Sequence, residues 1–166
     1  HVVRNAERDG VPHGVNEVGR LGHAIAAVAA VGDRLVAANT GDLVRWWWDG
    51  RGYAPTGTAR PRFPLADVVL TLTGDAVAIG GGVTGSRPGQ FGQAFRWPGQ
   101  DGGTGHHSER TDSPFVRAVS TVDGWVVAVD ARGVLWRIGP DAGITLEPWA
   151  RHPPVLRGPY RDPVLS

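Results

Sequence analysis

Two groups of residues in the sequence carry atoms that could take part in chemistry, and neither has the spacing of a known kind of site. His106-His107-Ser108-Glu109 offers imidazole, hydroxyl and carboxylate groups, but adjacent histidines on a glycine-rich segment lack the paired spacing of a metal site on a strand or helix. Residues 80–87 are glycine-rich, as phosphate-binding loops are, yet the closing Gly-Lys-Ser/Thr is absent. We therefore expect solvated loop residues at the first group and a flexible inter-strand loop at the second.

Catalysis by a serine nucleophile has no support in the pattern. The sequence holds no Gly-x-Ser-x-Gly elbow, and the aspartates at positions 33, 75, 123 and 130 fall in predicted turns, where their carboxylates would accept hydrogen bonds from local backbone N–H groups. The sequence therefore predicts a protein that is not an enzyme and has no metal site and no cofactor.

Trp46-Trp47-Trp48 is the most unusual local feature of the sequence. Successive side chains of a strand point to opposite faces, so the three indoles cannot share one core, although all three could be buried between neighbouring sheets. Tryptophan and arginine are enriched at the centres of protein interfaces. On this basis Trp46, Arg87, Trp97 and Trp136 are candidate partner-binding residues.

Three segments with a common pattern would position these residues. Each has an apolar strand, a turn of Gly with Asp, a second apolar strand, a polar or glycine-containing segment, and a third strand with an aromatic residue; they span about residues 22–50, 62–98 and 113–139. The turn glycines Gly32, Gly74 and Gly124 recur at intervals that suit the ~40 to 50 residues of one propeller repeat. The sequence predicts an all-β chain of about three four-stranded antiparallel blades.

The segments outside these strands are expected to contribute less. Residues 51–61 and 98–114, rich in Gly, Pro and His, are predicted loops. Residues 1–21 are assigned as an N-terminal segment that could add a strand to an adjacent blade. Residues 144–166 are a C-terminal segment in which 144–149 could be the strand that opens a fourth blade.

The first repeat resembles a WD-repeat, because it opens near Gly22-His23 and ends on Trp48-Asp49. In that family a His, a turn Asp and the closing Trp form a hydrogen-bonded structural network, which by this resemblance would comprise His23, Asp42 and either Trp47 or Trp48. The second and third repeats lack Gly-His and end on Trp97-Pro98 and Trp136-Arg137. The resemblance therefore rests on sequence in the first repeat and on strand and turn rhythm in the others, and a different propeller family with the same rhythm stays open.

Three blades do not close a ring, since propellers have about four to eight blades and each needs neighbours on both faces. The expectation is a partial or split propeller, completed by the rest of a larger protein, by further copies of the chain or by another subunit. Such propellers typically present loops to partner proteins. The sequence therefore predicts a protein-interaction or scaffold module of a larger bacterial protein or complex, with a carbohydrate- or small-ligand-binding propeller as the alternative.

Composition excludes several other classes. The 166 residues have a net charge of +1, and all 17 basic residues are Arg interleaved with acidic residues, so the basic stripe of a nucleic-acid-binding protein is missing. The absence of Cys excludes disulfides and thiolate sites. The longest apolar run, residues 24–31, is far shorter than the roughly 20 residues of a membrane span. Cytoplasmic location is expected because no signal sequence is evident.

Overall fold

The computed structural model describes residues 2–8, 11–19, 25–83, 90–99, 104–139 and 146–148, with only the backbone described in 2–8 and 11–19. These residues form fourteen strands and no helix. The strands are β1 Val2–Arg8, β2 Val11–Gly19, β3 Ala27–Val31, β4 Arg34–Ala38, β5 Leu43–Trp48, β6 Tyr53–Ala59, β7 Leu65–Leu70, β8 Ala76–Val83, β9 Gln90–Trp97, β10 His106–His107, β11 Phe115–Ser120, β12 Val126–Asp130, β13 Leu135–Ile138 and β14 Leu146–Pro148.

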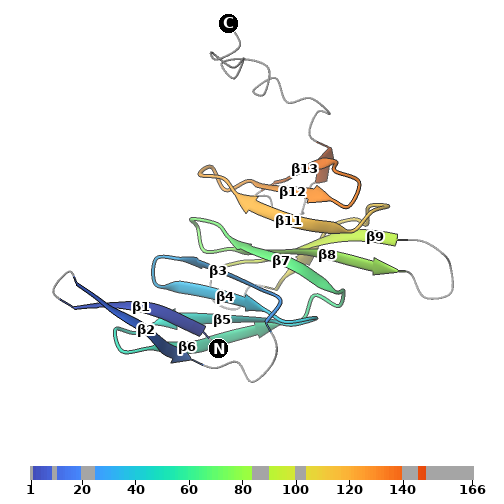
Figure 1. Cartoon of the computed structure of the whole chain (residues 1–166). Coiled ribbons are helices and arrows are strands. Elements are labelled where there is room, and N and C mark those ends of the chain that lie inside the picture. Colours follow the sequence, from blue (N-terminus) through green and yellow to red (C-terminus); the bar gives the residue numbers. More distant parts are fainter. Residues whose placement is uncertain are drawn as a thin grey trace, which may run out of the picture.

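Twelve of these strands form three four-stranded antiparallel sheets, in the orders β3-β4-β5-β6, β7-β8-β9-β10 and β11-β12-β13-β14. We call them the first, second and third sheets. They are stacked face to face in chain order, as the blades of a propeller are (Figure 1). The predicted all-β architecture of three blades is thus confirmed, and the described residues do not close a ring.

The turn between the first two strands is built in the same way in the second and third sheets. Thr71 N donates to Asp75 O at 2.9 Å and Gly74 N donates to Thr71 O, while Thr121 N donates to Trp125 O at 2.8 Å and Gly124 N donates to Thr121 O. Gly74 and Gly124 have φ angles of 87° and 84°, which only glycine adopts without strain. This shared turn places the two sheets in equivalent registers.

The outer strands correct the sequence-based boundaries. Residues 51–61 and 98–114 were predicted to be loops, but they contain β6 and β10, the fourth strands of the first and second sheets. The segment expected to open a fourth blade instead supplies β14, which pairs with β13 and completes the third sheet. Outer strands are short or contain proline, as at Pro55 and Pro148, because an edge strand needs fewer backbone donors.

The glycine run at residues 80–82 also differs from its prediction as a flexible loop. It continues β8, and Gly81 pairs with Gly92 of β9. A Cβ at Gly80 would meet the carbonyl oxygen of Pro64, and a Cβ at Gly92 would meet that of Ser113. The glycines therefore let backbone segments approach the β8–β9 hairpin closely, and residues 84–87 of the predicted loop lie outside the described residues.

Two hydrophobic cores lie between the sheets. The core between the first and second sheets contains Val36, Ala38 and Leu43 against Ala78 and Trp97, among others. The second core contains Val69, Val77 and Ile79 of the second sheet against Val126 and Ile138 of the third, among others. Alternate residues of β8 thus face opposite cores, so the second sheet is covered on both faces.

Residues 1–21 contain an antiparallel hairpin, β1–β2, and not a single added strand. Strand β2 lies against β6 of the first sheet, at the end of the stack opposite the third sheet (Figure 1). The described part of the chain contains no helix with the length and hydrophobicity needed to cross a membrane.

Candidate functional site

An arginine occupies the same position in the third strand of each sheet. Arg45 is opposite Val36, Arg96 is opposite Val77 and Arg137 is opposite Val127. Val36 and Val77 each lie in the core shared with the next sheet. Arg45 and Arg96 therefore lie on the face of their sheet that is directed towards the following sheet, and Arg137 lies on the equivalent face of the third sheet.

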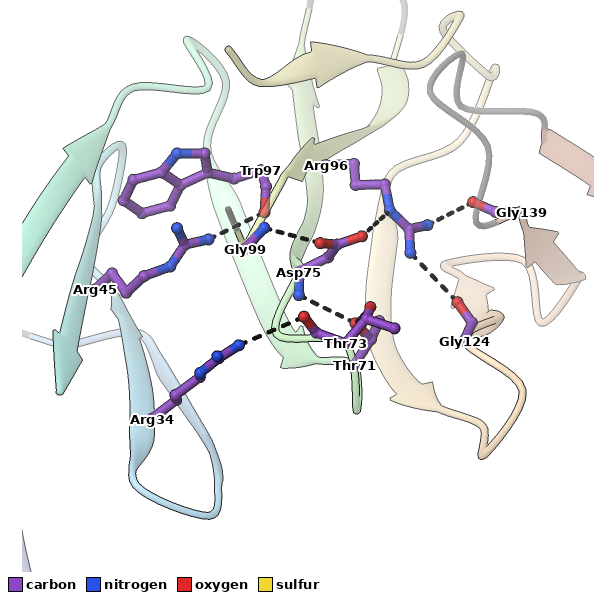
Figure 2. Close-up of polar contacts among 10 residues, drawn as sticks. All are labelled: Arg34, Arg45, Thr71, Thr73, Asp75, Arg96, Trp97, Gly99, Gly124 and Gly139. Carbon is purple, nitrogen blue, oxygen red and sulfur yellow. Dashed lines mark hydrogen bonds and ion pairs between the residues drawn. The ribbon is translucent and has the colours of Figure 1, made fainter. Parts of the chain in front are cut away.

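Arginines of the first sheet contact backbone carbonyls of the second sheet (Figure 2). Arg45 Nη2 donates to the carbonyl oxygen of Trp97 at 3.1 Å, and its guanidinium carbon lies 4.0 Å from the centre of the Trp97 ring. Arg34 Nη1 donates to the carbonyl oxygen of Thr73, at the turn between β7 and β8. The acceptors are therefore the end of a third strand and the turn between the first two strands.

Arg96 repeats this arrangement between the second and third sheets (Figure 2). It donates to the carbonyl oxygens of Gly139, just after β13, and of Gly124, in the turn between β11 and β12. Its Nε also pairs with Asp75 Oδ2 at 3.1 Å, and Asp75 Oδ1 accepts a hydrogen bond from Gly99 N. The Arg96 side chain is 4% exposed, so this network is a buried structural bridge.

One rim of the stack carries the exposed groups that could bind a partner. We define the turn rim as residues 31–34, 71–75 and 121–125 together with the ends of β5, β9 and β13; the turns lie on the left of the stack in Figure 1. Between its first two turns is an open cavity of about 290 Å³, lined by Val31, Asp33, Arg34 and residues 70–74. Leu72 and Val122, at equivalent turn positions, are 65% and 89% exposed.

Trp47 is the exposed member of the tryptophan triplet, with 47% of its surface accessible. The Arg34 guanidinium lies over its ring at 5.3 Å, beside the cavity. Trp48 packs edge-on against Tyr53. Either Trp47 or Trp48 was predicted to belong to a structural network, and the position of Trp47 on the turn rim makes it a candidate binding residue.

The other tryptophans proposed for partner binding lie elsewhere. Trp46 and Trp97 occupy equivalent positions, because each follows directly after the arginine of its third strand, and both are buried. The Trp46 indole packs with Leu35 and Ala37 in a separate cluster of the first sheet. The Trp97 indole lies in the core between the first and second sheets. Neither is the surface anchor that was predicted. Trp136 is half-buried and donates its indole N–H to Asp130. Arg87 lies outside the described residues.

The third sheet contains an aspartate–tryptophan contact at positions that differ from those predicted in the first repeat, Asp42 with Trp47 or Trp48. Asp130 accepts hydrogen bonds from Val134 N, Arg132 N and Trp136 Nε1. Burial alone would raise the pKa of Asp130, but these bonds and the Arg132 guanidinium outweigh it and hold the pKa below the usual range of an aspartate. Sequence reasoning had placed Asp130 in a locally bonded turn, and that is where it lies.

The first sheet cannot form the same contact, because the positions equivalent to Asp130 and Trp136 are Asn39 and Val44. Asn39 Oδ1 still accepts from Gly41 N and Asp42 N, so the turn is preserved without an indole donor. Asp42 pairs with Arg60 at 2.7 Å on the surface. His23, the third member of the expected network, lies outside the described residues.

The histidine segment has structural contacts. His107 bonds the carbonyl oxygen of Pro61 and stacks on Phe95, while Ser108 Oγ donates to Glu109 O and accepts from Ala94 N. Within the described ranges no three His, Asp or Glu side chains are grouped closely enough to hold a metal ion. These residues fasten β10 to the second sheet.

Sequence reasoning missed the arginine bridges, although a signal for them was present. Each third strand contains an apolar residue, an arginine and then a large apolar residue, as Val44-Arg45-Trp46, Phe95-Arg96-Trp97 and Trp136-Arg137-Ile138. An arginine at an otherwise apolar position of a central strand indicates a specific buried partner.

In comparisons with known proteins, no family model and no curated protein matches the chain.

Proposed function

We propose that this chain is a non-catalytic protein-interaction or scaffold module whose binding surface is the turn rim. The observation that carries the proposal is Trp47, an exposed indole stacked by Arg34 at the edge of a cavity that the exposed Leu72 also lines. Exposed tryptophan and arginine side chains beside a concave surface of mixed polar and apolar residues are typical of an interface hot spot. A segment of a partner protein with one apolar side chain and a nearby carboxylate would complement it.

The rim is well suited to this role because the framework beneath it is rigid. Arg34, Arg45 and Arg96 tie its turns together through carbonyls of neighbouring sheets. A preorganised surface loses little conformational entropy when a partner binds. We further propose that the chain is a divergent WD-repeat-like propeller segment and the scaffold or sensor part of a larger bacterial cytoplasmic protein.

The test compares partner capture by the unmodified chain and by Trp47→Ala and Leu72→Ser. Proteins retained from a bacterial lysate are identified by mass spectrometry, and binding is then measured with the purified partner. Val28→Ser is the matched control, because Val28 is also exposed (55%) but lies in β3 away from the turn. A purified partner whose affinity falls at least about tenfold with Trp47→Ala and not with Val28→Ser supports the proposal; equal affinities for all variants contradict it.

The carbohydrate-binding alternative predicted equivalent exposed aromatics in every blade. Of the tryptophans in the three closing strands, Trp47 is exposed, Trp136 is half-buried and Trp97 is buried, so they do not form an equivalent exposed set. No observation therefore favours this alternative over protein binding, and a glycan array probed with the labelled chain tests it directly.

A further inference from the structure

The third sheet has one face that repeats the covered faces of the other two sheets. Equivalent registers place Val119, Val127, Val129, Leu135 and Arg137 where the second sheet has Val69, Val77, Ile79, Ala94 and Arg96. We call these five residues of the third sheet the open face. Its composition is that of a face built to be covered by another sheet.

Accessibility distinguishes the open face from its counterparts. The five residues of the second sheet are between 0% and 8% exposed, because the third sheet covers them. On the open face Val119 is 63% exposed, and Val127, Val129 and Leu135 are only half-buried. Isolated exposed apolar residues are ordinary, but a contiguous apolar face whose two counterparts are interfaces indicates a binding surface.

Arg137 defines what the open face would bind. Its counterparts Arg45 and Arg96 each donate to a backbone carbonyl at the end of the next sheet's third strand. Arg137 instead stacks over Trp125 of its own sheet, with the guanidinium carbon 3.7 Å from the ring centre. A partner that supplied backbone carbonyls to Arg137 would repeat the contacts of Arg45 and Arg96, whereas two open faces packed on each other would place two arginines together.

The other end of the stack has the form of such a partner. The β1–β2 hairpin has a register like that of the β5–β6 hairpin. Arg4 is opposite Asn16, and a register shift follows between Asn5 and Glu7. Arg45 is opposite Gly57, and a register shift follows directly after Arg45. Val3-Arg4 also repeats the pair Val44-Arg45. The hairpin thus corresponds to the third and fourth strands of a sheet. The two ends of the stack therefore differ, since one carries the hairpin and the other carries the open face.

We propose that the open face of one copy docks on the hairpin end of a second copy, in a head-to-tail arrangement. This contact would use the face of the third sheet that corresponds to the covered faces of the first and second sheets, with Arg137 directed at the end of β1, the third-strand equivalent, of the second copy. Such heterologous contacts form rings or open chains according to the rotation between copies. The inference is separate from the proposed rim function, because it involves a different surface.

The first test is sedimentation velocity of the full chain over a range of micromolar concentrations. We expect the mass to rise above the monomer's 17.6 kDa as concentration increases. Val119→Glu should raise the dissociation constant at least about tenfold. Val122→Glu is the matched control, since Val122 is 89% exposed in the turn of the same sheet and off the open face. A monomer at every concentration, or equal weakening by both variants, overturns the proposal.

A second test identifies the surface that the open face contacts. Because the chain has no Cys, single introduced cysteines report unambiguous contacts. Val119→Cys is mixed with either Val15→Cys or Asn16→Cys, which replace two adjacent residues of β2. A disulfide between Val119→Cys and one hairpin variant is expected. Pairing of Val119→Cys with itself alone, or with neither hairpin variant, overturns the head-to-tail arrangement.

Discussion

Replacing Arg96 by methionine should destabilise the chain strongly, because methionine keeps the apolar stem and removes the bridge between the second and third sheets. Three interactions are lost, to Asp75, Gly139 and Gly124 at 3.1, 2.6 and 3.4 Å. Breaking a buried ion pair costs about 3–5 kcal/mol. Asp75 remains 23% exposed and keeps the hydrogen bond from Gly99 N, so we expect the low end, about 3 kcal/mol.

The loss is measured by urea unfolding followed through tryptophan fluorescence and circular dichroism. For a chain of this length about 3 kcal/mol corresponds to a melting temperature lower by about 6–12 °C. Arg137→Met is the matched control, because Arg137 has the same strand position but stacks on Trp125, and it should cost less than about 1 kcal/mol. If Arg96→Met costs no more than Arg137→Met, the carbonyl bridge does not hold the sheets together as we argue.

Three further substitutions probe the packing and the turns. Trp46→Ala should cost about 3–5 kcal/mol in unfolding free energy and Trp47→Ala less than about 1, because only Trp46 is buried; similar losses would contradict the assignment of the exposed indole. Gly92→Ala should lower the melting temperature and the yield of folded chain, since its Cβ would meet Ser113 O; an unchanged melt would show that the two segments separate easily. Asp130→Asn should cost about 1–2 kcal/mol at pH 7. Because the folded pKa of Asp130 is depressed, its contribution is present above about pH 4 and is lost as pH falls through the folded value, so the variant should show a flatter acid dependence of stability; equal acid limbs would count against this role.

The inner three strands of each sheet could be predicted because their physical signals are local. Alternating or continuous runs of Val, Leu, Ile and Ala mark strands buried between layers, and Gly74 and Gly124 mark turns that need positive φ. The outer strands carry weaker signals. β6 contains Pro55 and Gly57, and β10 has only two residues, so both were taken as loops.

The candidate site was harder to predict, since exposure depends on how the sheets pack and not on a single strand. Alternation required that Trp46 and Trp47 point to opposite faces, and they do. It could not indicate which face the neighbouring layer covers. Likewise the family resemblance predicted an Asp–Trp contact in the first repeat, and it gave no indication of the hydrogen bond from Trp136 to Asp130 in the third sheet.

The hydrogen bonds from Arg96 to the third sheet have a consequence for how the sequences of such sheets can change. Its acceptors there are the main-chain oxygens of Gly124 and Gly139, which every residue type would supply. The sheet that supplies these carbonyls can therefore change most of its side chains and keep the hydrogen bonds, provided that its turn and the end of its third strand stay in place. We expect sheets joined through main-chain carbonyls to tolerate duplication and exchange, because these contacts place few constraints on side-chain identity.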